Sequence, residues 1–261
     1  MSSLHRGFSP AAFAGSLPSA APSRADESQR RATPLMRRFE ISVLRPDLTA
    51  DFVQVTAPAA PLFEECASAF ARGTLIETVR GPVAVEDLIP GDYIQTAMGA
   101  EPITWIGSTT YIPHRADDAT LLTHLTRITA DAMGLGQPPM DLLLGPAARM
   151  VIRHQKLKTL LGQEAVLAPV TEYTDGDRFL EVAPAGSVQL YHLMVRRHTT
   201  LNVGGVEIET FHPGNGASQN LGAKTRALFM ALFPHLETLG DFGETCATRT
   251  TREVVESLIN T

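Results

Sequence analysis

Cysteines, long apolar runs and clustered positive charge are all scarce in this sequence, and each shortage excludes a class of protein. Two cysteines in 261 residues, Cys66 and Cys246, are too few for a disulfide framework and lack the paired spacing of a zinc site. No apolar run approaches the roughly 18 residues that span a bilayer. With a net charge of -6 and scattered basic residues, the chain offers no concentrated positive surface for nucleic acid. We therefore expect two free thiols, no membrane span, no nucleic-acid partner and, by default, a cytoplasmic location.

The composition is that of a folded globular protein. Hydrophobic residues make up 44% of the chain, which supplies enough apolar material for a buried core, and charged residues make up 19%. A chain of this length fits one good-sized domain with tails.

The composition and hydrophobic pattern of residues 1–66 are not those of an independent domain. Residues 1–37 are rich in Ser, Ala, Pro and Arg without any sustained period, which predicts a disordered leader. Residues 38–66 are predicted to hold one short strand and a linker. Apolar and polar side chains alternate from Phe39 to Leu44, and Pro58 and Pro61 punctuate the segment that follows.

The middle of the chain has the pattern of a mainly β domain. Short runs of β-branched and aliphatic residues alternate with turn residues every six to ten positions. The predicted strands are 74–78, 93–96, 102–107, 125–129, 142–144, 150–153, 166–170 and 189–195. The clearest element is a hairpin, 199–203 and 206–209, joined by Gly204-Gly205, because such a pair supplies the positive φ of a primed turn. Helical spacing then appears at 224–233 and 252–259, which predicts a short helical tail.

One polar loop invites a metal hypothesis. His114, Asp117, Asp118 and His124 lie within eleven positions of the sequence. A metal site needs three or four converging ligands with supporting groups behind them, whereas a polar loop of this composition is commonplace. We therefore expect no metal and no other cofactor, and metal binding here stays a minor alternative.

The sequence from Phe70 to Thr96 resembles the opening block of bacterial Hint (hedgehog/intein-type) self-processing domains. It contains a Gly-Thr-x-Ile strand, a glycine turn, a Val-Glu-Asp-Leu segment and a Gly-Asp turn in the order and spacing of that family. The likeness continues through residues 102–107, 141–152, 188–198 and 205–214. It implies a Hint-type β fold at 67–214 and makes 215–261 a helical C-terminal extension, as in the bacterial branch with such extensions.

The resemblance also implies a chemistry. In this family a Cys or Ser at the first position attacks the preceding carbonyl and converts a peptide bond into an ester or thioester. A histidine of the second block protonates the scissile amide, and a polar residue of the third block assists proton transfer. Inteins then release themselves by cyclisation at a terminal His-Asn pair, whereas hedgehog-type members pass the ester to an outside nucleophile.

The residues at the matching positions are different in this chain. Ala69 stands at the nucleophile position and Ala148 at the second-block histidine, and a methyl group has neither a lone pair to attack with nor an acidic proton to donate. Glu209-Thr210 aligns with the terminal His-Asn pair and is unable to cyclise. Among the implied catalytic positions, only the third block keeps histidines, His192 and His198. His192 is predicted to pack at the sheet surface, and His198 to bind a neighbouring backbone group.

Two functions stay open at this point. The first is a degenerate domain that no longer cleaves itself and serves as a structural or binding module, with a protein partner that the sequence does not name. The second is autoprocessing through Cys66 or Ser68 with His198 assisting. Register disfavours it, because three residues of strand displace Cys66 by roughly 10 Å and a one-residue offset turns Ser68 to the opposite face.

Overall fold

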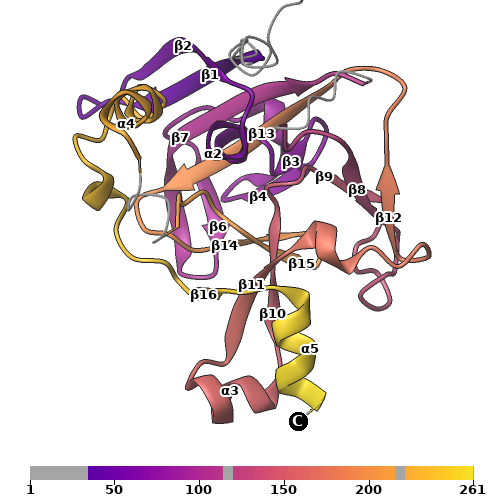
Figure 1. Cartoon of the computed structure of the whole chain (residues 1–261). Helices are drawn as coiled ribbons and strands as arrows, with labels where there is room; N and C mark the ends of the chain where they lie inside the picture. Colours follow the sequence, from indigo (N-terminus) through magenta and orange to yellow (C-terminus); the bar gives the residue numbers. More distant parts are fainter. Residues whose placement is uncertain (1–34, 114–119, 215–220, 261) are drawn as a thin grey trace, which may run out of the picture. The chain divides into compact units, whose positions relative to one another are not determined.

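Strands dominate the computed structural model of this chain, which describes residues 35–113, 120–214 and 221–260 (Figure 1). In chain order the strands are β1 (Met36–Leu44), β2 (Ala50–Pro58), β3 (Phe70–Ala71), β4 (Leu75–Thr78), β5 (Gly81–Ala84), β6 (Tyr93–Thr96), β7 (Gly99–Tyr111), β8 (Leu125–Ile128), β9 (Leu142–Leu144), β10 (Arg149–Arg153), β11 (Ala165–Pro169), β12 (Phe179–Val182), β13 (Val188–Val195), β14 (Thr200–Val203), β15 (Val206–Glu209) and β16 (Thr248–Arg249). The helices are α2 (Pro61–Glu64), α3 (Gln155–Leu161), α4 (Ala223–Met230) and α5 (Arg252–Asn260), with short 3₁₀ turns η1 (Glu65–Ala67), η2 (Val85–Asp87), η3 (Val170–Tyr173) and η4 (Leu239–Phe242). The predicted mainly β fold with a helical tail is confirmed.

The long strand β7 connects the two halves of the sheet. The strand order is β12-β8-β9-β3-β13-β7-β6-β14-β15-β10-β11-β16, with β1 and β2 attached at β7 and with β4 and β5 attached at β6. Strand β7 pairs along its second half with β1 and β13 and along its first half with β6. Nearly all neighbours are antiparallel, the exception being β11 and β16. The 13 residues of β7 are long enough to serve both halves, since a typical strand has only about five or six.

The segment 38–66 is more ordered than its prolines predicted. It holds a second strand, β2, that pairs in continuous antiparallel register with β1, from Met36 opposite Pro58 to Leu44 opposite Ala50. Strand β1 also begins at Met36, inside the predicted leader, while residues 1–34 of that leader lie outside the described part of the chain. The alternation in Ala50–Pro58 was a valid strand signal that the flanking prolines obscured.

Some of the other predicted strands and turns have the expected bounds, and two elements were not predicted. The strands at 93–96 and 142–144 have the predicted bounds, and the hairpin of β14 and β15 turns on Gly204 and Gly205 with φ of 58° and 88°. Strand β12 and helix α3 were not predicted. Gly162, with φ of 68°, ends α3 in the left-handed conformation typical of a helix C-terminus, and it was the missed signal.

The helical tail packs on the body of the domain. Trp105 of β7 is fully buried and donates its indole N–H to the Leu232 carbonyl at 2.7 Å. Its ring stacks on Phe233 with centroids 4.8 Å apart. These residues form a core cluster with Phe63, Phe211 and Phe229, so the residues after α4 share one core with the first strands. No helix in the described ranges has the length and apolar character to cross a membrane.

Replacing Phe233 by alanine tests whether the tail is part of the core. The ring is fully buried, so Phe233→Ala should lower the free energy of unfolding by about 3 to 5 kcal/mol in urea denaturation. The matched control is Phe52→Ala, whose side chain is 69% exposed and which should change stability by less than about 0.5 kcal/mol. Equal effects of the two substitutions would refute this packing.

Candidate functional site

Ala69 occupies the position at which the family resemblance places the nucleophile, at the start of β3. Its side chain is fully buried, and backbone hydrogen bonds hold it on both sides. Its N–H donates to the Tyr191 carbonyl of β13 at 2.9 Å, and its carbonyl accepts from Gly145 N–H at 2.8 Å. The first position is therefore fixed between the third-block strand and the second-block loop.

The loop before β10 surrounds the bond that a nucleophile would attack. The N–H of Ala147 donates to the Ser68 carbonyl at 3.1 Å, and Ala148 beside it is fully buried. A side chain at Gly145 would place its Cβ 2.1 Å from the same Ser68 oxygen, so only glycine permits this approach. The carbonyl before Ala69 keeps a backbone donor, while the side chains that would act on it are methyl groups.

The side chains of the two alternative nucleophiles, Cys66 and Ser68, are bonded to other groups. Cys66 is fully buried in the core cluster that contains Trp105, whereas Ala69 and Ala148 belong to a separate cluster. Burial raises the pKa of the Cys66 thiol well above its usual value, and its Sγ donates to the Leu62 carbonyl at 3.3 Å. The hydroxyl of Ser68 donates to the Glu64 carbonyl at 2.7 Å, so it too is engaged away from the Ala69 peptide bond.

His192 lies inside the molecule, so the predicted position at the sheet surface is wrong. Its ring contacts Phe70 and Phe211 edge-on and is only 3% exposed. Nδ1 lies 2.9 Å from the Glu65 carbonyl, to which it must donate, while Nε2 has no hydrogen-bond partner in the part of the chain described. Burial lowers the pKa of His192 to about 4, which leaves the imidazole neutral at physiological pH.

His198 is held in one tautomer by its neighbours. The backbone N–H of Cys246 donates to Nδ1 at 2.8 Å, so the ring proton must reside on Nε2 when His198 is neutral. Nε2 lies 3.2 Å from the Thr210 carbonyl and 3.0 Å from Glu209 Oε1. Both nitrogens are thus engaged with the Glu209-Thr210 pair and with the C-terminal extension.

Glu209 is a buried acid at the end of β15. It is 1% exposed, and its Oε1 accepts from Arg249 Nε at 2.9 Å. Arg149 approaches its other oxygen at 3.9 Å. Burial alone would raise the pKa of Glu209, but the hydrogen bond from His198 and the charge of Arg249 outweigh it and hold the pKa below its usual value.

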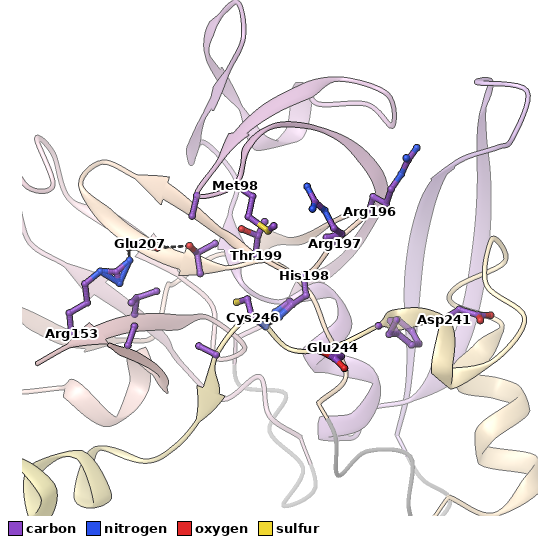
Figure 2. Close-up of a pocket in the computed structure, with 17 residues that line it drawn as sticks. Met98, Arg153, Arg196, Arg197, His198, Thr199, Glu207, Asp241, Glu244 and Cys246 are labelled. Carbon is purple, nitrogen blue, oxygen red and sulfur yellow. Dashed lines mark hydrogen bonds and ion pairs between the residues drawn. The ribbon is translucent and has the colours of Figure 1, made fainter. Parts of the chain in front are cut away.

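A cavity of about 610 Å³ opens beside this cluster (Figure 2). Figure 2 shows Cys246 and His198 adjacent at its centre, with Thr199 above them and with Arg153 and Glu207 paired at 2.7 Å to one side. Residues 241–247 of the extension form part of its wall, so the body and the extension build the cavity jointly. Burial, with the nearby Glu209 charge, raises the pKa of Cys246 to about 11, so this thiol stays protonated at neutral pH.

The site residues named from the sequence fall into two groups. Ala69 and Ala148 belong to the same core cluster, while His198 lies with Glu209 and Thr210 at the end of β15. The sequence did not identify Arg249 as a partner of Glu209, because the threonine-rich segment around it contains no recognisable motif. Of the four metal candidates only His124 is described, and no group of three or more metal-binding side chains exists within the described ranges.

Comparisons with known proteins agree with the sequence resemblance. Residues 68–215, more than half of the chain, match a family described as Hint domain. The solution structure of a bacterial intein-like domain from Clostridium thermocellum is similar with a TM-score of 0.38 and 15% identity, over 56% of this chain and 99% of that one. A crystal structure of the gp41-1 intein gives 0.35 and 9%, over 56% and 100%. A comparison with curated protein sequences gave no match.

The buried imidazole of His192 makes stability depend on pH. Because its pKa is about 4 in the folded chain against 6.5 in model peptides, its contribution is complete above pH 6.5 and is lost as the pH falls toward 4. The loss should reach about 3 kcal/mol. His192→Gln keeps a donor for the Glu65 carbonyl but does not titrate, so urea unfolding at a series of pH values should show a flatter curve. Parallel stability curves for the parent chain and His192→Gln would contradict the lowered pKa of the buried His192.

Proposed function

The chain belongs to the Hint domain family, and we propose that its Hint domain no longer cleaves its own backbone and serves as a structural or binding module. The pair of alanines at positions 69 and 148 carries this proposal. Autoprocessing starts with attack on the Ser68 carbonyl by a side chain at position 69. A buried methyl group stands there, and a second one stands where the amide nitrogen would be protonated.

The groups nearest to this peptide bond offer no replacement. The thiol of Cys66 lies in another core cluster with its pKa raised, and the Ser68 hydroxyl is bonded back to Glu64. His192 keeps one free lone pair, but a base needs a nucleophile to serve. At the Ser68–Ala69 peptide bond only backbone contacts remain, and the N–H of Ala147 donates to the Ser68 carbonyl.

The residues that align with the terminal His-Asn pair of inteins, Glu209 and Thr210, support the proposal independently. Cyclisation requires an asparagine amide, and Thr210 instead binds Thr199 through its hydroxyl, donating to the Thr199 carbonyl at 3.0 Å and accepting from its N–H at 3.1 Å. Glu209 replaces the penultimate histidine and forms an ion pair with Arg249. The same cluster anchors the extension, because Cys246 N–H binds His198. These bonds would hold the C-terminal extension at the cleavage site, which is not expected of a chain that cleaves itself there.

The alternative is residual autoprocessing through Cys66 or Ser68 with His198 assisting. It requires those side chains to leave their present hydrogen bonds and reach a carbonyl. His198 would also have to give up the Cys246 N–H before its Nδ1 lone pair became available.

The mass of the purified chain distinguishes the two functions. We expect an unbroken 28.1 kDa species after prolonged incubation with dithiothreitol or hydroxylamine, nucleophiles that would trap a thioester or ester. Fragments that begin at residue 66, 68 or 69 would overturn the proposal. The variants Cys66→Ala and Ser68→Ala then identify the nucleophile, since only loss of the responsible side chain abolishes such fragments.

Replacing Arg249 tests whether its ion pair with Glu209 holds the C-terminal extension on the body. Arg249→Gln removes the main partner of the buried Glu209 carboxylate and should cost about 3 kcal/mol of stability in urea unfolding. It should also speed proteolysis within residues 243–260. Arg226→Gln is the matched control in the same extension, at an exposed position of α4, and should change stability by less than about 0.5 kcal/mol. If the two variants behave alike, Glu209 does not hold the extension.

A further inference from the structure

The neighbouring strands β2, β1, β7 and β13 carry a cavity of about 550 Å³ on one face of the sheet. Glu40 of β1 lies between Gln54 of β2 and Ser108 of β7, directly opposite each of them. Ser108 in turn lies opposite Tyr191 of β13. Residues directly opposite one another in antiparallel strands point to the same face. These four side chains, all of which line the cavity, therefore form one polar row across its floor.

A second row of side chains beside the polar row is mainly apolar. Phe52 of β2 lies opposite Ser42 of β1, and Ser42 lies opposite Ile106 of β7. The Phe52 ring is 69% exposed, and Leu88 and Ile89 add further apolar surface to the same cavity. Two residues of strand separate the rows, a distance of about 6 to 7 Å. The cavity thus has a polar part and an apolar part within the length of one small molecule.

The wall of this cavity is negatively charged. Glu40 and Glu86 both line it, and no lysine, arginine or histidine is among the described residues that do. Each carboxylate has an arginine partner outside the wall, Arg38 at 2.8 Å from Glu40 and Arg72 at 3.4 Å from Glu86. These arginine side chains are 61% and 68% exposed, so the two ion pairs are weak. Both carboxylates are therefore able to attract a further cation.

The hydroxyl of Tyr191 responds to the same negative charge. Burial and then the charge of Glu86 raise the pKa of Tyr191, and Glu40 and Asp87 act in the same direction, while Arg72 opposes them. Within the described ranges this hydroxyl has no hydrogen-bond partner, so its oxygen is free to accept a hydrogen bond. Aromatic rings such as those of Tyr191 and Phe52 also attract organic cations. Carboxylates, an available oxygen and aromatic rings all favour the same kind of ligand.

We propose that this cavity binds a small organic ammonium ion with an apolar body. The ammonium group lies at the polar row, where Glu40 and Glu86 balance its charge, and the body lies on Phe52 and Ile89. A two-carbon link between ring and nitrogen matches the spacing of the rows. An inorganic divalent cation fits poorly, because it needs six or more oxygen ligands in close geometry. The proposal does not depend on whether the domain cleaves itself, since the family's reaction requires none of these side chains.

An NMR titration of the full chain with 2-phenylethylammonium chloride tests this site. The matched probes are 2-phenylethanol, which is neutral, and phenylacetate, which is anionic. We expect the ammonium ion to bind at least tenfold more tightly than the alcohol at low salt, less so at high salt, and phenylacetate not to bind. The amide signals that shift should include those of residues 40, 52, 86 and 191. Absence of binding, or equal affinity for the alcohol, would refute the proposal.

Matched substitutions separate the two parts of the cavity. Glu40→Gln keeps the shape of an exposed side chain, removes its charge and should weaken binding of the ammonium ion about tenfold, with little effect on the alcohol. Phe52→Ala should weaken both ligands alike, about fivefold, because it removes apolar contact. Glu237→Gln removes the same charge at an exposed position of the extension and should change neither affinity. Thermal unfolding of each variant should match that of the parent chain. The proposal fails if Glu40→Gln binds like the parent chain or if Glu237→Gln weakens binding equally.

Discussion

The buried carboxylate of Glu209 is the constraint on which the C-terminal half of the structure depends. An isolated charge inside a protein is so costly that it must be paired and hydrogen-bonded. Arg249 and His198 meet this need at 2.9 and 3.0 Å, and Arg149 lies a little further away. Because Arg249 belongs to the extension and His198 to the body, satisfying one carboxylate joins the two. Arg249 also donates to the His212 carbonyl, which fixes the chain after β15 in the same place.

The segment around Ser68 and Ala69 is held by a different interaction, namely close backbone contact between neutral groups. Gly145, Ala147, Ala69 and Ser68 form a compact set of peptide hydrogen bonds around the bond that the family's chemistry attacks. Small side chains at these positions let the second-block loop pack directly on β3. The segment around Ala69 thus relies on buried methyl groups and backbone contact, whereas the segment around Glu209 relies on the pairing of a buried charge.

The sequence predicted the features that are local and periodic. The strand at Tyr93–Thr96, the Gly204-Gly205 hairpin and both tail helices each carry their own signal in alternation, turn residues or helical spacing. The family resemblance also predicted that Ala69 and Ala148 stand at the positions of the nucleophile and the second-block histidine. The sequence missed β2, whose flanking prolines resemble a linker, and it misplaced His192, because an alternating strand does not reveal that its outer face will be covered by Phe211 from further along the chain. The role of Arg249 was beyond reach, since a partner 40 residues away leaves no local pattern.

Gly145 shows how close backbone contact determines the geometry around the Ser68–Ala69 peptide bond. Its backbone is not in the left-handed region that glycine alone favours, so conformational freedom does not account for it. The reason is distance, since any side chain would collide with the Ser68 carbonyl oxygen. That contact places Gly145 N–H on Ala69 and Ala147 N–H on Ser68, and it joins β9 to β3 and hence to β13. A side chain at Gly145 would disturb this contact near the centre of the sheet, where β9, β3 and β13 are neighbours.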